Sequence, residues 1–159
     1  MASTTVSLLS LYDKEGYSLL KFAAEEGCLP AVKYFLKTGF DVTYEINGKF
    51  PIDFVKKDSK DYSDIVLELL KANSPFPKDF TTEGVSDKLK AFTALMTKMH
   101  QAIKEKNVDE VAKIADENKS LNNFYLYNPK SKYENISAFK YAQSSNLRRV
   151  IEIFFAKNI

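Results

Sequence analysis

Residues 13–43, DKEGYSLLKFAAEEGCLPAVKYFLKTGFDVT, decide the fold prediction, because they contain two short helical patterns with a turn signal after each. Apolar residues predict a first helix over about residues 18–26, and the serine at its start can cap the free N–H groups. Gly27 is a natural left-handed stop for this helix. Pro30 falls in the first turn of the second helix, where its missing N–H costs nothing, and Gly39 ends that helix. We therefore expect one complete helix–turn–helix unit.

The side chains expected on the buried side of this unit are apolar and recur at helical spacing. They are Leu19, Leu20, Phe22, Ala23 and Ala24 in the first helix and Ala31, Val32, Phe35 and Leu36 in the second. Cys28, the only cysteine, lies between the two helices. We expect a buried or half-buried thiol there rather than a nucleophile, and a lone cysteine excludes an internal disulfide.

These residues resemble an ankyrin repeat, a unit of about 33 residues with a β-turn, two antiparallel helices and a T-P-L-H-x-A core motif. Residues 18–24, SLLKFAA, stand where the motif would be, with Leu19 for its proline and Lys21 for its histidine. Gly27 and Gly39 match the family's helix-turn and exit-loop glycines. The resemblance implies an all-α, ankyrin-like solenoid of helix–turn–helix repeats with short β-turn fingers. It also implies that losing the histidine and proline weakens hydrogen bonding between neighbouring units.

A second unit over residues 45–73 repeats the pattern of the first. Its residues 48–55, GKFPIDFV, echo residues 16–23, and Asn47-Gly48 is a strong turn signal that predicts a finger tip. Its second helix is predicted through Ile65, Val66, Leu69 and Leu70, with Ser63 as the cap. Two prolines in residues 73–85 exclude a helix at the start of that segment, so we expect an irregular connector.

Two further units are predicted over about residues 86–121 and 133–159. The stripe Leu89, Phe92, Met96, Met99 and Ile103 predicts an elongated first helix over residues 86–106, paired with a second helix over residues 109–117. Residues 122–135 are expected to form a loop, and residues 137–142, SAFKYA, form the fourth copy of the motif. Together with residues 13–44 and 45–73, these units predict a single ankyrin-repeat domain over residues 1–159.

Composition and motifs exclude several classes of function. The net charge of +2, from 23 basic and 21 acidic residues, gives no electrostatic footprint for nucleic acid. The apolar runs are far shorter than a membrane span, and no signal peptide is predicted. One histidine and one cysteine cannot make a zinc site, and His100 falls at a motif position that is structural in the family. We therefore expect no enzyme activity, no metal and no cofactor.

Recognition of another protein is the expected function. Ankyrin-like stacks bind partners with their finger tips and the concave face of their first helices, so the resemblance selects residues of those two kinds. We also count aromatic side chains of the loop 122–135 among the predicted partner-binding residues, because aromatics are favoured interface anchors. Phe124 and Leu126 could equally pack beneath the loop. The predicted partner-binding residues are Tyr17, Glu25, Glu26, Ile46, Asn47, Lys49, Lys57, Tyr125 and Tyr127.

The sequence thus predicts a non-catalytic, cytoplasmic protein–protein interaction module that acts as an adaptor or as an occluding inhibitor. Its Lys- and Asn-rich composition also fits a bacterial effector that acts on host proteins inside a host cell. The alternative is a small-molecule-binding or enzyme-associated subunit. The last predicted helix has an apolar stripe of Leu147, Val150, Ile151 and Phe154, and Ile153 and Phe155 lie beside it. Apolar residues on two faces of this C-terminal helix suggest a homodimer contact, a partner surface or a missing neighbour.

Overall fold

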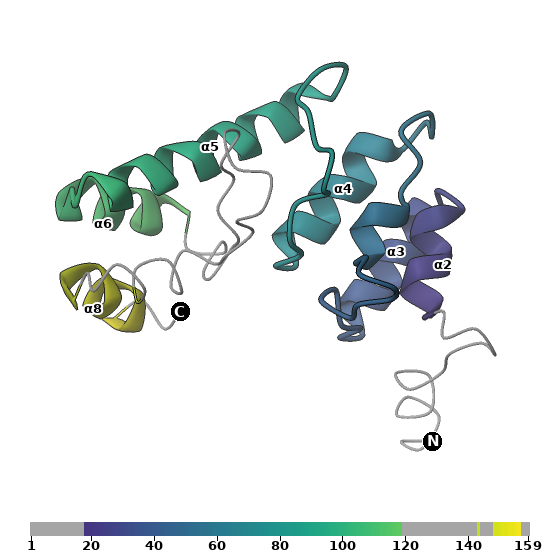
Figure 1. The fold of residues 1–159 in the computed structure, drawn as a ribbon, viewed down its shortest axis with the longest axis horizontal. Coiled ribbons are helices and arrows are strands. Elements are labelled where there is room, and N and C mark those ends of the chain that lie inside the picture. The colour runs from purple at the N-terminus through teal and green to yellow at the C-terminus, as the bar shows by residue number, and fades with distance from the viewer. Residues whose placement is uncertain (1–17, 119–142, 144–147, 157–159) are drawn as a thin grey trace. The chain divides into compact units, whose positions relative to one another are not determined.

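The computed structural model describes residues 18–118, 143 and 148–156, and these residues are mostly helical. The helices, shown in Figure 1, are α2 (Leu19–Glu25), α3 (Leu29–Lys37), the 3-10 helix η1 (Pro51–Phe54), α4 (Tyr62–Lys71), α5 (Asp87–Lys104), α6 (Val108–Glu117) and α8 (Arg148–Ala156). The chain divides into two compact units, unit 1 over residues 1–77 and unit 2 over residues 78–159. The boundary falls inside the predicted connector 73–85, whose residues form no helix.

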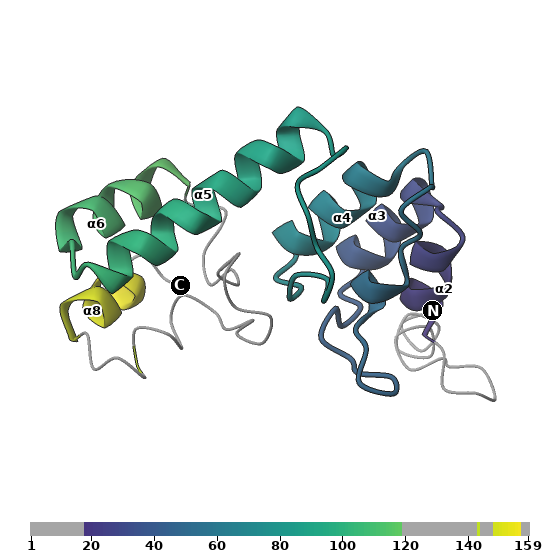
Figure 2. The ribbon, with the colours of Figure 1, turned by 45° about the horizontal axis from the view of Figure 1, so that its top comes forward.

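Unit 1 begins with the predicted hairpin. Ser18 caps α2, since its side-chain oxygen accepts from the backbone N–H of Lys21 at 3.0 Å. Helix α3 carries a proline in its first turn, as the sequence predicts. Helix α2 packs against both α3 and η1, and α3 packs against α4, so these elements lie side by side in Figures 1 and 2. The core of this unit is built mainly from α2 and α4, through fully buried Leu20, Ile65 and Leu69.

The same type of C-terminal turn, a Schellman motif, closes α2, α3, α4 and α5. In each, a residue with positive φ follows the helix: Gly27 (φ 69), Gly39 (φ 90), Asn73 (φ 69) and Lys106 (φ 57). After α3, the N–H of Phe40 donates to the Phe35 carbonyl at 3.1 Å. The two rings also pack at 4.9 Å between centroids, which is the hydrophobic contact that accompanies this motif.

The second predicted unit is only partly regular. Its first helix is a single 3-10 turn, η1, because Val55 leaves the helical conformation at φ −67 and ψ 121. Its second helix, α4, begins at Tyr62 after Asp61, so the prediction that Ser63 caps it was wrong. The polar turn between them lies against the hairpin of α2 and α3: a Cβ added to Gly27 would stand 2.6 Å from the Ser59 hydroxyl oxygen.

Unit 2 is organised around the 18-residue helix α5. Ser86 caps it by accepting from the Leu89 N–H at 3.3 Å. The predicted stripe is confirmed, since its residues are all buried: Leu89, Phe92, Met96, Met99 and Ile103. Helix α6 packs along α5 and also against α8, where Val150 is buried.

Two further predictions about unit 1 were wrong. Phe22 was expected on the buried side of α2, but its side chain is 58% exposed, because helical periodicity turns it away from Leu20 and Ala24. Cys28 was expected to be at least half-buried, but it is exposed, since it occupies the N-cap position in the turn between the two helices.

Several predictions fall outside the described residues. These concern the loop 122–135, the fourth motif copy at residues 137–142, and the side chain of Phe155. The expectation of a single repeat domain also stays a prediction. None of the described helices is both long enough and apolar enough to cross a membrane.

Candidate functional site

A tight hairpin turn over residues 46–49 forms the predicted finger. Ile46 and Lys49 exchange two backbone hydrogen bonds, of 2.8 and 3.0 Å between N and O. Asn47 and Gly48 between them both have positive φ, of 51° and 76°, which is the conformation that an Asn-Gly pair favours in such turns. Asn47 and Lys49 are exposed and Ile46 is half-buried, so the tip presents polar side chains on a fixed backbone.

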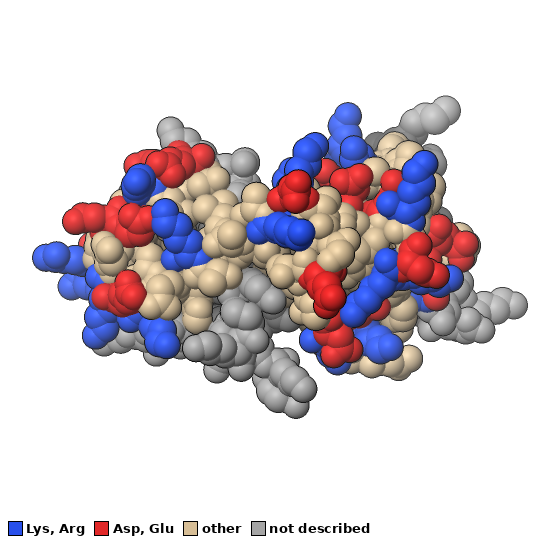
Figure 3. All heavy atoms as spheres, turned by 90° about the horizontal axis from the view of Figure 1, so that it is seen from above, with Lys and Arg blue, Asp and Glu red and all other residues tan. Residues whose placement is uncertain are grey.

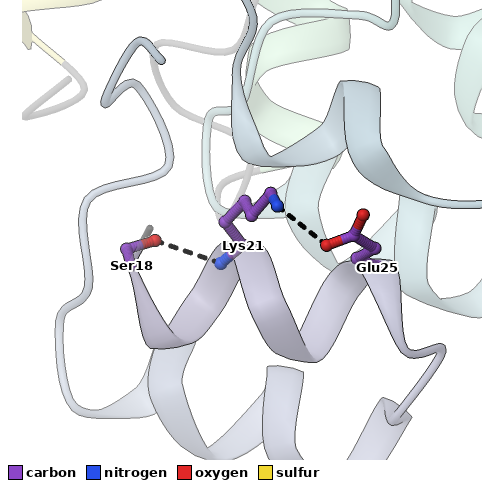
Figure 4. A network of polar contacts seen from close by, with 3 residues as sticks. All are labelled: Ser18, Lys21 and Glu25. Atoms are coloured by element: carbon purple, nitrogen blue, oxygen red, sulfur yellow. Dashed lines mark hydrogen bonds and ion pairs between the residues drawn. The ribbon is translucent and has the colours of Figure 1, made fainter. Parts of the chain in front are cut away.

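A buried lysine links the first helix to the elements that follow the finger. The Lys21 side chain is 3% exposed, and its ammonium lies 2.7 Å from a carboxylate oxygen of Glu25, one turn further along α2. Figure 4 shows both side chains on the same side of the helix, with the backbone N–H of Lys21 bonded to Ser18. A buried charge needs such pairing to offset its desolvation, so Glu25 has a structural role as well as a half-exposed surface.

Phe54 of η1 joins the buried lysine to the finger. The Lys21 ammonium nitrogen lies 4.5 Å from the centroid of the Phe54 ring, and that of Lys49 lies 5.8 Å from it. Both distances are within the range of cation–π attraction, which contributes about 0.5–1 kcal/mol at exposed sites and about 2 where the cation is desolvated. We call these four residues, Lys21, Glu25, Lys49 and Phe54, the α2–η1 seam.

The exposed face of α2 continues the seam. Phe22 and Glu25 are three residues apart and therefore neighbours on the helix surface. A second exposed aromatic, Tyr34, lies on α3, with 57% of its side chain exposed. Its ring packs against Phe35 in an edge-to-face arrangement, with 5.8 Å between centroids. The two helices of one hairpin thus each expose one large aromatic side chain.

The seam brings together two of the predicted partner-binding residues, Glu25 and Lys49. Ile46 and Asn47 adjoin it in the finger. Glu26 is exposed at the C-cap of α2, and Lys57 is exposed in the turn after η1. Three predicted residues lie outside the described part of the chain: Tyr17, Tyr125 and Tyr127.

Sequence reasoning missed Lys21, Phe54 and Phe22 as functional candidates. Lys21 was noted only as a departure from the ankyrin histidine, although a lysine four residues before a glutamate signals an ion pair. Nothing local indicates that Phe54 lies beside Lys21, because the contact joins two different helices. Phe22 was assigned to the core by hydrophobicity alone.

Unit 2 offers a different surface on α5. An open groove of about 660 Å³ runs along this helix, lined by Thr82, Lys90, Thr93, Ala94, Thr97, Lys98 and Gln101. The hydroxyls of Thr93 and Thr97 donate to backbone carbonyls of their own helix, at 2.8 and 2.9 Å. The threonine hydroxyls are therefore engaged within the helix, which leaves their methyl groups for the groove.

An ion pair at the edge of this groove connects α5 to α6. Lys98 and Glu110 are 2.7 Å apart. The hydrogen bond from Lys98 lowers the pKa of the Glu110 carboxyl below its usual range, and the same bond raises the pKa of Lys98. Each group thus favours the charged state of the other, on a surface where solvent screens the attraction.

The described residues contain no group of three or more histidine, cysteine, aspartate or glutamate side chains that could hold a metal ion. His100 is half-buried in α5. On the face shown in Figure 3, acidic and basic side chains are interspersed over the described surface. The described surface on this face therefore shows no large patch of a single charge.

Comparison of the chain with protein-family models, with curated proteins and with solved structures gives no match.

Proposed function

We propose that this chain is a protein-binding module built as an ankyrin-like solenoid. It acts by occupying a surface of its partner, as an adaptor or as an occluding inhibitor, and not by catalysis. The observation that carries the proposal is the α2–η1 seam, which joins a finger residue, Lys49, to first-helix residues of two successive predicted repeats.

The packing of unit 1 supports a repeat arrangement. The first helices of the two predicted repeats, α2 and η1, pack against each other, and so do their second helices, α3 and α4. A solenoid requires this nearest-neighbour scheme, because each repeat buries its apolar face only against the next one.

The turn between the helices supports the same arrangement in unit 2. After α2, the N–H of Cys28 donates to the Ala23 carbonyl at 3.0 Å, and after α5 the N–H of Asn107 donates to the Ala102 carbonyl at 2.9 Å. Ala23 is the alanine of the first motif copy, and Ala102, two residues after the motif histidine His100, is that of the third copy. The third predicted repeat thus closes its first helix as the first repeat does.

A protein partner suits the chemistry of this surface. Phe22 exposes a large apolar ring, and the seam beside it carries one lysine on a rigid finger. Interfaces are enriched in such aromatic anchors, which contribute most when a partner desolvates them.

Two exposed aromatics on one hairpin give a matched test. Phe22→Ser changes the proposed surface, whereas Tyr34→Ser changes an equally exposed residue on the second helix. Affinity capture from cell lysate, read by quantitative mass spectrometry, should recover a protein with the native chain and with Tyr34→Ser but not with Phe22→Ser. Circular dichroism of all three chains checks their folding. If only Tyr34→Ser failed to capture the protein, the site would lie on the second helices. If the native chain captured no specific protein, the proposal would be contradicted.

The α5 groove supports a second candidate function, the binding of a small molecule. Its volume lies within the range of about 300–1,000 Å³ that ligand sites occupy. It is open along one helix face and would leave a bound ligand partly exposed to solvent, so it ranks second. A ligand screen by thermal shift, repeated with Ala94→Phe to fill the groove, tests it: hits that the substitution abolishes would favour this function.

A further inference from the structure

We infer that Lys49 is the anchoring cation of the partner-binding surface, and that the partner supplies a carboxylate side chain next to an apolar one. This inference rests on the proposed function and names the chemistry of its partner. It follows from the charges of the α2–η1 seam, which differ sharply between its two lysines.

The charge of Lys21 is satisfied within the chain. Its ammonium is buried and pairs with Glu25 at 2.7 Å, so the only carboxylate of the seam is engaged with the buried lysine. Lys49 is exposed, and no carboxylate of the described residues lies within ion-pair distance of it. Within the described part of the chain, the seam therefore carries one uncompensated positive charge, and that charge is at Lys49.

The position of Lys49 is fixed in advance of binding. Two backbone hydrogen bonds between Ile46 and Lys49 hold the finger, and cation–π attraction to the Phe54 ring, 5.8 Å away at its centroid, favours this position of the ammonium. A lysine side chain normally loses considerable rotamer freedom when it forms an ion pair. A preorganised ammonium loses less, so its pairing with an incoming carboxylate is more favourable than that of a freely rotating surface lysine.

The surroundings of Lys49 specify the residue that the partner places next to its carboxylate. Phe54 is half-buried, and its ring is the aromatic surface that lies next to the Lys49 ammonium. A partner that places a carboxylate on Lys49 would bring its neighbouring residues over the Phe54 ring. An aromatic or branched aliphatic side chain there would bury apolar surface and would exclude water from the charge pair, which strengthens it.

Selection of displayed random 12-residue peptides on the immobilised full chain tests the inference. Peptides selected by the native chain should combine Asp or Glu with an adjacent aromatic or aliphatic residue. The enriched peptide, synthesised for titration, should bind Lys49→Glu at least roughly tenfold more weakly, since a charge-assisted pair is replaced by repulsion. Lys33→Glu is the matched control, because it reverses the charge of an exposed lysine on α3. Circular dichroism and protection of the finger amides check that Lys49→Glu keeps its fold.

Each outcome distinguishes the inference from the function on which it rests. Loss of binding on Lys49→Glu but not Lys33→Glu, and on replacing the peptide's Asp or Glu with Asn or Gln, supports both. Selected peptides without an acidic residue, or equal affinity for the two variants, overturn the inference and leave a binding module that uses other contacts. Failure to select any peptide, together with failure to capture a protein from lysate, overturns both.

Discussion

Unit 1 and unit 2 each contain a helical hairpin, but the first helix is seven residues long in unit 1 and 18 residues long in unit 2. Isolated helices shorter than about 12–15 residues are marginal in water. Helix α2 therefore depends on its cap, its turns and its neighbours α3 and η1, whereas α5 has a long stripe of buried side chains of its own. In this chain the same type of turn therefore closes two helices that are stabilised in quite different ways.

The turn itself differs in one residue that matters. Gly27 and Lys106 occupy the same position of the Schellman motif, with φ of 69° and 57°. Glycine adopts this conformation without strain, whereas a residue with a Cβ atom does so at a cost. The shorter hairpin thus has the favourable residue in its turn, and the longer one tolerates an unfavourable one. Substitutions in the two hairpins test this division of stability.

Met96→Ala should have the largest effect, because it opens a cavity in the stripe on which unit 2 depends. Met96 is fully buried, and such truncations lower the free energy of unfolding by about 2–5 kcal/mol. Chemical denaturation measures the change, and hydrogen exchange should place it in α5 and α6. Lys90→Ala on the exposed side of α5 is the control, with an expected change within about 0.5 kcal/mol. A loss below 1 kcal/mol for Met96→Ala would mean that the stripe is not what stabilises this helix.

Gly27→Ala should destabilise unit 1 more than Gly39→Ala does. Both substitutions place a Cβ atom in a left-handed conformation, which costs about 1–2 kcal/mol. At Gly27 the new atom also meets the Ser59 hydroxyl, whereas at Gly39 nothing lies within 4 Å. Adding Ser59→Ala should remove the difference between the two variants in thermal unfolding. If the double variant recovers nothing, the close approach of the two turns does not contribute to stability.

Lys106→Gly should stabilise unit 2 modestly. Glycine relieves the strain of the positive φ but increases the freedom of the unfolded chain, so a gain of about 0.5–1 kcal/mol is expected. Urea denaturation measures the change in the free energy of unfolding. The control is Lys104→Gly within α5, which should lower the free energy of unfolding by about that amount. Equal effects of the two substitutions would show that the turn at Lys106 carries no strain.

Breaking the Lys98–Glu110 ion pair should have the smallest effect on the free energy of unfolding, and that effect should depend on pH. Lys98 lowers the pKa of Glu110 in the folded chain, so the contribution of the pair is fully present above the pKa of glutamate in the unfolded chain. It is lost as pH falls through the lowered folded pKa. An NMR titration should show the Glu110 pKa returning toward its ordinary value in Lys98→Met. An unchanged pKa would exclude Lys98 as the cause.

Features set by neighbouring residues in the chain were predictable from the sequence. The cap Ser18, the stops at Gly27 and Gly39 and the buried stripe of α5 all follow from local chemistry, and all are confirmed. The Asn-Gly turn of the finger is confirmed for the same reason. Ser86 was expected as the first residue of its helix and is instead the cap.

Features set by contacts between distant segments were not predictable. Hydrophobicity assigned Phe22 to the core, but it does not tell which side of a short helix meets a neighbour. The shortening of a predicted helix to η1 depends on how residues 55–61 turn back over the first hairpin. For the candidate site, Glu25 and Lys49 were named from their positions, while the role of Phe54 depends on its contacts with α2 and with the finger.

Photo-crosslinking tests the central claim, that the first-helix and finger surface of unit 1 binds a protein, most directly. Benzoylphenylalanine introduced at position 22 or at position 34 replaces one exposed aromatic residue with another and disturbs the fold little. After irradiation in cell lysate, the account predicts a specific crosslinked protein from position 22, at much higher yield than from position 34. A specific crosslink from position 34 alone, or none from position 22, would contradict it.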